Sequence, residues 1–444
     1  MRSSHILDRI ATTFDDGRLI ADAGLLLPAT LAQHLGLERL LDEHVDLGPA
    51  KGRAHVGAKA LTLIMSALAG GDCIDDADAL RAGGTAAVLG HALRAPSTLG
   101  TFLRSFSWAH ARQLDVVSRE LLRRAWATGA GSAQGALTID LDSTICETYG
   151  LQKEGATHFT YTHVRGYHPL LAVAAGTGEV LHCRLRGGRA TSGRGAAGFL
   201  AETIARVRGA GASGPLMVRA DAGFYEAAVV RACRKAEARF SITVRLQQAL
   251  RARIEALAET AWAPIPYWQE GGADVAELPY TPFAEHHPDA REVRLIVRRV
   301  RPSPGSQLAL FTPYSYHAFI TDRAGATLAL EADHRRHAVV ENTIRDLKYG
   351  VGLGHLPSGR FGANAAWLAL QVMAHNLARW TGHIGLGDAL LTTKTIRRRL
   401  FSPSGRLAWS ARRLLLHLPR SWPWADRFAA ALAALRAIAL PLTA

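Results

Sequence analysis

Residues 136–146, ALTIDLDSTIC, form the stretch of sequence that decides the fold. Its apolar residues occupy every second position, namely Leu137, Ile139 and Leu141. Two acids, Asp140 and Asp142, stand at the positions between and after them. Because successive side chains of a β-strand point to opposite faces, this alternation predicts a strand that buries one face. Both acids then project from the other face.

The residues that follow predict further strands and helices in a regular order. Two strands joined by Gly176-Thr177-Gly178 would form a β-hairpin, and two helices would alternate with two more strands. The segments are 170–175 and 179–185 for the hairpin, 195–208 and 225–238 for the helices, and 215–220 and 240–246 for the strands. This order is typical of an α/β fold with a mixed sheet and crossover helices. Asp221 follows a strand directly, at the carboxyl end where sites in open α/β sheets usually lie.

The chain is strongly basic. Its 444 residues include 52 Lys and Arg against 38 Asp and Glu, which gives a net charge of +14. A charge this large on a folded chain indicates a polyanionic partner, with nucleic acid as the first candidate and an anionic membrane surface as the second. From Thr392 to Arg420 every charged residue is basic. This run is either a surface that follows phosphates or merely a solvated face, and its length without an acid favours the first.

Membrane and secreted proteins do not fit the sequence. No uninterrupted apolar run of about 18 residues occurs, so a spanning helix is not expected. Residues 1–15 are too polar for a signal peptide. The four cysteines are scattered, which disfavours a zinc site or a disulfide framework. We therefore expect a cytoplasmic, nucleoid-associated protein with no membrane partner.

Changes in composition divide the chain into five expected segments. Apolar residues at helical spacing predict a helical N-terminal domain at 1–130, and the first part of an α/β core would follow at 131–250. The family resemblance given below implies that the first domain binds DNA and that the core is catalytic. Prolines and short strand-like pieces predict a β-rich insertion at 251–325. The core would end with a helical part at 326–385. A basic C-terminal region would complete the chain at 386–444.

Three acids in separate segments are suited to hold metal ions. Asp142 lies on a predicted strand, Asp221 directly follows another, and Glu341 follows a basic stretch. Cleavage of a phosphodiester needs an activated water or 3′-hydroxyl and relief of charge on the leaving oxygen, and two divalent ions about 4 Å apart supply both. Carboxylates are the hard oxygen ligands that hold Mg²⁺. Each acid alone also has an ordinary explanation as a turn former or an ion-pair partner.

Together these motifs resemble the DDE transposases of bacterial insertion sequences, in particular insertion-sequence family 1380. The resemblance runs from about Thr138 to Trp380. The matching motifs are Asp140-Leu141-Asp142-Ser143-Thr144, Gly166-Tyr167-His168-Pro169-Leu170, Leu185-Arg186-Gly187-Gly188, Arg219-Ala220-Asp221-Ala222-Gly223-Phe224, Glu341-Asn342-Thr343-Ile344 with Lys348, and Ala374-His375-Asn376-Leu377. The resemblance implies a ribonuclease-H-like core interrupted by a β-rich insertion. It also implies two Mg²⁺ or Mn²⁺ ions and a homodimer on DNA.

The resemblance further implies roles for single residues. Asp142, Asp221 and Glu341 would be the catalytic metal ligands. The family's Asp-Ser/Thr-Thr pattern favours Asp142 over Asp140, which alternation alone cannot separate, and Asp140 stays open as a second ligand or an orienting neighbour. Related transposases carry a Tyr, Arg, Glu, Lys signature on the last helix, and here histidines replace the first two, at His334 and His337. The expected DNA contacts are Lys348, Arg345, Arg336, Arg335, Arg397, Arg398 and Arg399.

The helix that carries Glu341 is expected to begin at Asp333 as N-cap and to stop at Gly350. A period of 3.6 residues places a polar group on the face of Glu341, namely His334, His337, Arg345 and Lys348. An apolar stripe lies beside it, made of Val340, Ile344 and Leu347. A helix built in this way would pack its stripe on the sheet and direct Glu341 toward the other acids.

These observations predict a cut-and-paste DNA transposase. It would bind terminal inverted repeats, hydrolyse phosphodiester bonds at the element ends with metal ions, and join the 3′-hydroxyls to target DNA. Two alternatives remain open. One is a metal-dependent nuclease without strand transfer, and the other is a non-catalytic DNA-binding relic of a transposase.

Overall fold

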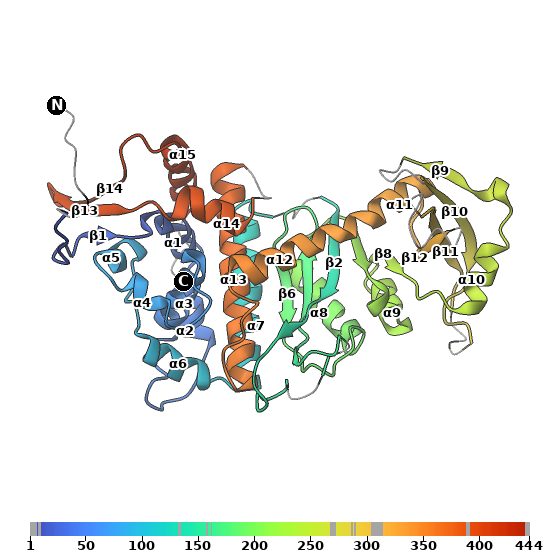
Figure 1. The fold of residues 1–444 in the computed structure, drawn as a ribbon, viewed down its shortest axis with the longest axis horizontal. Helices are drawn as coiled ribbons and strands as arrows, with labels where there is room; N and C mark the ends of the chain where they lie inside the picture. Colours follow the sequence, from blue (N-terminus) through green and yellow to red (C-terminus); the bar gives the residue numbers. More distant parts are fainter. Residues whose placement is uncertain are drawn as a thin grey trace.

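A computed structural model describes residues 7, 10–131, 135–156, 159–160, 162–266, 272–285, 287, 290–302, 314–387 and 391–439. The molecule is elongated, with a helical unit at one end, a mixed sheet in the middle and a β-rich continuation of that sheet at the other end (Figure 1). The α/β class predicted from the sequence is confirmed.

Nine strands form one mixed sheet in the order β6-β5-β2-β7-β8-β12-β11-β10-β9. The strands are β2 (Leu137–Ser143), β5 (Leu170–Ala174), β6 (Val180–Arg184), β7 (Leu216–Ala220), β8 (Arg239–Thr243), β9 (Ala263–Ile265), β10 (Ala273–Tyr280), β11 (Val293–Val300) and β12 (Ser315–Thr321). β2 pairs antiparallel with β5 and parallel with β7, which in turn pairs parallel with β8. The predicted hairpin is confirmed as β5 and β6, and the predicted helices as α8 (Ala196–Gly209) and α9 (Ala227–Lys235).

The β-rich residues after β8 continue the same sheet. β12 pairs antiparallel with β8, and β11, β10 and β9 follow outward, each antiparallel to its neighbour. Between β8 and β9 lie one α-helix, α10 (Gln248–Glu255), and a short 3-10 helix, Glu259–Ala261. The strands predicted here are present, but they widen the central sheet instead of forming a layer of their own. The chain then returns from β12 to the helices that carry Glu341.

The helical unit is built from both ends of the chain. Its longest helix, α13 (Phe361–Leu386), is buried along most of its length because it is apolar on all sides. It packs against α1, α3, α6 and α7 from the N-terminal part and α15 from the C-terminal part. The bounds are α1 (Leu26–His34), α2 (Leu37–His44), α3 (Val56–Ala69), α4 (Ala77–Leu80), α5 (Thr85–Leu89), α6 (Pro96–Arg104), α7 (Trp108–Ala127), α14 (Thr393–Ile396) and α15 (Ala425–Arg436).

Two small sheets complete the fold. β1 (Leu19–Ile20), β13 (Gly405–Ser410) and β14 (Arg413–His417) form a three-stranded sheet at the helical end, so the two ends of the chain meet there as well. β3 (Cys146–Glu147) pairs with β4 (Gly166–Tyr167) beyond the end of β2. Among the helices that the structure describes, none is long and apolar enough to cross a bilayer.

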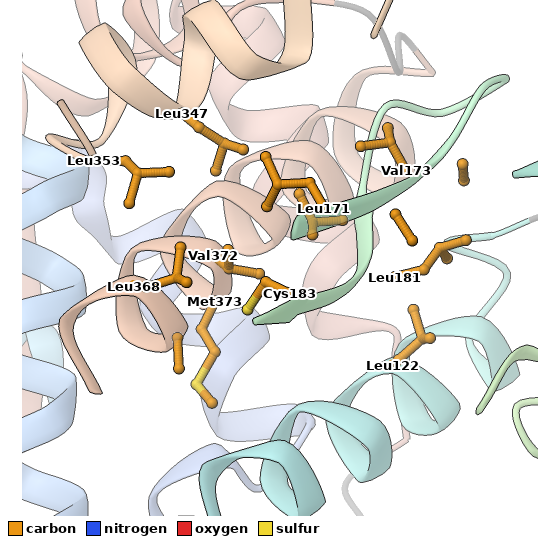
Figure 2. Packing of buried hydrophobic residues seen from close by; sticks show 14 of the residues in the cluster. Leu122, Leu171, Val173, Leu181, Cys183, Leu347, Leu353, Leu368, Val372 and Met373 are labelled. Carbon is orange, nitrogen blue, oxygen red and sulfur yellow. The ribbon is translucent and has the colours of Figure 1, made fainter. Parts of the chain in front are cut away.

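One continuous apolar cluster joins the helical unit to the sheet (Figure 2). Its labelled side chains come from α7, β5, β6, α12, the segment after it and α13: Leu122, Leu171, Val173, Leu181, Cys183, Leu347, Leu353, Leu368, Val372 and Met373. Full burial of one such side chain contributes roughly 1.5–3 kcal/mol. The sheet is therefore held against α13 and is not an independent module.

The helix that carries Glu341 differs from its prediction at one end. A first helix, α11, already begins at Thr327 and ends at Arg335, a 3-10 turn follows at Arg336–Val339, and α12 runs from Val340 to Gly350. The expected N-cap at Asp333 is therefore wrong, because Asp333 lies inside α11. The predicted stop at Gly350 is confirmed. The apolar stripe is confirmed too, since Val340 and Leu347 are buried and Ile344 packs against the core.

Candidate active site

The carboxyl ends of β2 and β7 bring Asp142 and Asp221 next to each other. Leu141 lies opposite Ala220 in the parallel pairing, so the two acids come next on strands that run roughly 4.8 Å apart. Asp142 Oδ1 accepts the backbone N–H of Ser143 at 2.6 Å. Asp221 Oδ1 accepts the backbone N–H of Gly223 at 2.8 Å, and so caps the short 3-10 turn after β7. Each carboxylate has one oxygen fixed by its own backbone.

Glu341 joins this pair from the first turn of α12. Burial raises the pKa of Asp142 to about 6, and the negative charges of Asp221 and Glu341 act in the same direction. The positive charge of His337 opposes them. The structure thus brings the three predicted acids, which come from distant segments, within electrostatic reach of one another. Asp142 is half-buried, whereas Asp221 and Glu341 are exposed, so the group opens to solvent.

The three carboxylates suit divalent cations. They offer hard oxygen ligands. Burial is the main cause of the raised pKa of Asp142, and the negative charges of Asp221 and Glu341, which a cation would relieve, add to it. In the described part of the chain, Asp142 and Asp221 each keep one oxygen without a hydrogen-bond partner. Their ligand atoms do not gather within 4.8 Å of one another as a tight single-ion cage would.

A tighter acidic group lies elsewhere, at Asp72, Cys73 and Asp76. Asp76 accepts the backbone N–H groups of Asp72 and Cys73 at 2.9 and 3.1 Å. These contacts explain the group as a turn after α3, formed by a side chain that caps the backbone. It is also distant in sequence from the strand-end acids.

Asp140, two residues before Asp142, has a different environment. Its two oxygens accept Nε and Nη2 of Arg219, both at 2.8 Å, and Oδ1 also accepts Nδ1–H of His337 at 2.9 Å. Asp140 is 1% exposed and Arg219 is 3% exposed. A buried carboxylate shared between a guanidinium and an imidazole has little capacity left for a metal ion. Of the two roles left open for Asp140, the geometry fits the orienting neighbour.

The ion pair of Asp140 and Arg219 extends to the helix before Glu341. Arg219 Nη1 donates to the backbone carbonyl of Asp333 at 2.7 Å. Arg323 pairs with the carboxylate of Asp333. Arg219 thereby links β2, β7 and α11. Its role was not predicted, although one arginine inside the apolar strand Leu216–Ala220 signals a buried partner, because an unpaired buried charge is very costly.

The two histidines that replace the family's Tyr and Arg have structural contacts. His334 stacks on Phe319 with ring centroids 4.0 Å apart, and it contacts the hydroxyls of Ser241 and Thr243 at 2.6 and 3.0 Å. Burial lowers the pKa of His334 to about 3, so this ring is neutral at ordinary pH. His337 contacts Asp140, as described above. Both rings attach the Glu341 segment to the sheet.

A loop beside the acids also escaped prediction. Arg186 donates to the backbone carbonyls of His168, Thr191 and Arg194 at 2.7–2.9 Å, and so closes the loop that follows β6. His168 Nε2 contacts the hydroxyl of Ser143 at 2.9 Å, and that hydroxyl contacts Ser192 at 2.9 Å. This chain of contacts fixes the backbone directly after Asp142. His168 and Arg186 lie in two of the motifs quoted above, but their partners depend on tertiary structure.

The basic residues of the Glu341 segment lie on α12 and directly before it. Lys348 Nζ donates to the carbonyl of Ile145, just after β2, at 2.9 Å. Arg336 and Arg345 are exposed, and Arg335 forms an ion pair with Glu331 at 3.3 Å. The ordinary alternative for this helix is an ion pair between Glu341 and Arg345, and no such pair occurs among the described residues.

The three consecutive arginines expected to contact DNA separate in the structure. Arg397 donates to the carbonyls of Leu68 and Ala67 at 2.7 and 2.9 Å, and also to that of Gly350. It therefore caps the carboxyl end of α3, where helix carbonyls lack partners, and its guanidinium is not available to DNA. Arg398 is exposed and Arg399 is half-buried. Arg397 thus leaves the set of expected DNA contacts.

Acids at neighbouring strand ends, a third acid from a late helix and nearby basic groups are typical of enzymes that process phosphodiesters with divalent ions. The chain belongs to the transposase family described as "Transposase DDE domain group 1", whose model matches residues 4–440. Enzymes of this family generally use divalent metal ions. DNA transposition is thereby the functional class of the protein.

Comparisons with individual proteins add little. No curated protein matches the sequence. A solved structure, that of a piggyBac transposase synaptic complex with hairpin DNA, is similar with a TM-score of 0.42 and 10% identity, over 86% of this chain and 80% of that one. A likeness at this level carries no argument about function.

Proposed function

We propose that this protein is a cut-and-paste DNA transposase. It binds the terminal inverted repeats of its element, hydrolyses the phosphodiesters at their ends and joins the freed 3′-hydroxyls to target DNA. The observation that carries the proposal is the convergence of Asp142, Asp221 and Glu341 in a chain of the DDE family. The order of the first five strands, with β2 between an antiparallel hairpin and two parallel strands, supports a ribonuclease-H-like core.

Asp142, Asp221 and Glu341 would hold two divalent ions, Mg²⁺ or Mn²⁺. Such ions lower the pKa of an attacking water or 3′-hydroxyl and neutralise charge on the leaving oxygen. The protein's own contribution is to position the three carboxylates. β2 and β7 fix the first two carboxylates at neighbouring strand ends, and the contacts of Asp140, Arg219 and His337 fix the segment that presents the third. The backbone after Asp142 is held by His168 and Ser143.

DNA would lie across the open side of these acids. Arg345, Arg336, Arg335 and Lys348 on the Glu341 segment, with Arg398 and Arg399, are the proposed phosphate contacts. Phosphate contacts fix the position of DNA without reading its sequence. Two element ends must be handled together, so a homodimer on DNA belongs to the proposal, as does membership of insertion-sequence family 1380.

Two reactions test the proposal against its rivals. With duplexes that carry the ends of the element, Mg²⁺-dependent nicking is expected from the native chain, and its absence would favour the non-catalytic relic. With a pre-cleaved end that has a free 3′-hydroxyl, joining to a plasmid is expected. Nicking without joining would favour the nuclease that lacks strand transfer.

A further inference from the structure

The hairpin of β13 and β14 projects from the helical end of the molecule (Figure 1). Its base is anchored, because Leu407 is buried with Ile20, Ala23 and Val88 in a small core. β1 pairs only with the first two residues of β13, Gly405 and Arg406. From Trp409 to Leu415 every residue is exposed. The outer part of the hairpin therefore extends beyond the body of the protein.

Three large apolar side chains remain uncovered on this outer part, namely Trp409, Leu414 and Leu415. Trp409 lies opposite Leu414 in the register of the hairpin, on the same face as the buried Leu407. Trp409 is 74% exposed and Leu414 is 38% exposed. An exposed tryptophan next to a leucine, outside the packed core, indicates a surface that another molecule covers.

The charge of the hairpin specifies the kind of partner. Arg412 and Arg413 occupy its tip, and neither forms an ion pair among the described residues. Arg406 at the base is 51% exposed and pairs with Asp16. The chain contains no acid from residue 392 to residue 420. A polyanion is the complementary partner.

The turn of the hairpin contains an arginine, Arg412, at a positive φ that most residues other than glycine and asparagine rarely adopt. Ala411 and Arg412 have φ values of 45° and 68°, as the two central residues of a type I′ hairpin turn require. Asn-Gly is the usual pair at these positions, because other residues are disfavoured at positive φ. An arginine kept at such a tip suggests that its charge is used.

We propose that the β13–β14 hairpin is a DNA-binding arm. Arg412 and Arg413 contact phosphates, and Trp409 with Leu414 packs against the sugars and base edges of the groove that the hairpin enters. A two-stranded β-ribbon fits the major groove of B-DNA. The proposal rests on the proposed function, because DNA is the polyanion on which a transposase acts.

A path of exposed cations connects this arm to the candidate active site. α12 packs against α14, and the chain continues from α14 through a π-helical turn, Arg397–Phe401, into β13. Arg345 on α12 and Lys394 on α14 line one cavity of about 630 Å³. Arg398 is exposed on the next turn. DNA bound at the arm can thus follow cationic side chains toward Glu341.

The competing occupant is a second copy of this chain. β14 is the outer strand of its sheet, and its free edge could pair with the β14 of another molecule. Antiparallel pairing about Leu415 would place Arg413 opposite His417 of the other copy and set the two basic turns at opposite ends of the joined strands. Neither β14 strand carries an acid that could balance Arg413 of the other copy. DNA fits the charge and the second copy does not.

The test measures binding of the full chain to a mixed-sequence duplex of about 30 base pairs at several salt concentrations. Arg412→Ala with Arg413→Ala should lower the slope of log affinity against log salt by about two, because each lost phosphate contact removes about one. Trp409→Ala should weaken binding about tenfold without changing the slope. Lys235→Ala with Arg291→Ala removes two exposed charges from the end of α9 and the residues before β11, away from the helical end of the molecule, and is the matched control.

The outcomes distinguish a failure of the proposed DNA-binding arm from a failure of the proposed transposase function. An unchanged slope in the arginine double variant, or an equal change in the control, overturns the arm. Loss of a dimer without DNA in Trp409→Ala, with DNA affinity unchanged, overturns it in favour of the second copy. The arm variants should still nick saturating end DNA in Mg²⁺ at low salt. If the native chain itself neither binds nor nicks DNA, the proposed function fails instead.

Discussion

Asp140 and Asp142 stand two residues apart on the same face of β2, yet they belong to two different regions. Asp142 lies at the end of the strand, where burial and two neighbouring carboxylates raise its pKa to about 6. Asp140 lies one step inside, where Arg219 and His337 neutralise it. In the strand-end region the carboxylates lack an ion-pair partner among the described residues and are open to solvent. In the interior region the charge of Asp140 is balanced, and its ion pair with Arg219 links β2, β7 and α11. Two identical side chains on one face of a strand can thus have different roles, because the neighbouring strands and helices give them different environments.

The largest expected effect concerns the strand-end region. Asp142→Asn, Asp221→Asn and Glu341→Gln should each lower metal-dependent nicking by about 10³-fold or more, because each removes a proposed metal ligand. DNA binding and the melting temperature should stay near those of the native chain. Asp426→Asn, an exposed acid on α15, is the control. Any of the three variants that retains native Mg²⁺-dependent cleavage removes its residue from the site.

The interior region should respond in the opposite way. Asp140→Asn leaves the buried Arg219 without its carboxylate, and breaking a buried pair from one side costs about 3–5 kcal/mol. Urea unfolding should show this loss of stability even without DNA or metal. Asp140→Leu combined with Arg219→Met should recover part of it, since apolar residues of similar size often replace a buried pair without loss. A stable Asp140→Asn variant that has lost metal binding would instead make Asp140 a ligand.

Glu179, a fully buried acid, extends the comparison because burial is the largest cause of its pKa shift. Glu179 accepts Trp126 Nε1–H at 2.9 Å, and burial raises its pKa from 4.5 to about 7. Between these two pH values the folded state holds a proton that the unfolded state has lost, so stability should fall as pH rises from about 4.5 to 7, by up to about 3 kcal/mol. Glu179→Gln should flatten this dependence and raise the free energy of unfolding at neutral pH. Unfolding curves with the native slope in the variant would contradict the assignment.

The smallest effects distinguish two adjacent arginines. Arg397→Ala should destabilise the protein by about 1–3 kcal/mol, because buried carbonyls of α3 lose their donor, and should leave the salt dependence of DNA binding unchanged. Arg398→Ala should leave the melting temperature unchanged and lower the salt slope by about one. Equal behaviour of the two variants in both measurements would return this run to a merely solvated face.

Features that depend on local sequence patterns could be predicted, and features that depend on contacts between residues distant in sequence could not. Alternation of apolar residues was enough for β2, and the glycine-bearing turn was enough for the hairpin of β5 and β6, because both patterns are local. The start of α11 was missed because Asp333, a good N-cap by type, is held inside a helix by Arg219 and Arg323. The role of Arg397 was missed because its partners lie on α3, far away in sequence. The continuation of the sheet through β12 likewise depends on a pairing with β8 that no local pattern contains.

The position of Glu341 along the chain has a consequence for the newborn protein. A ribosome produces Asp142 and Asp221 well before α12, which packs against α13 and follows the helix that Arg219 holds at Asp333. Domains fold as they emerge during synthesis, so an unfinished chain holds two of the acids without the third. Under the proposed function, a polypeptide truncated before α12 would lack Glu341, and its catalytic group would stay incomplete.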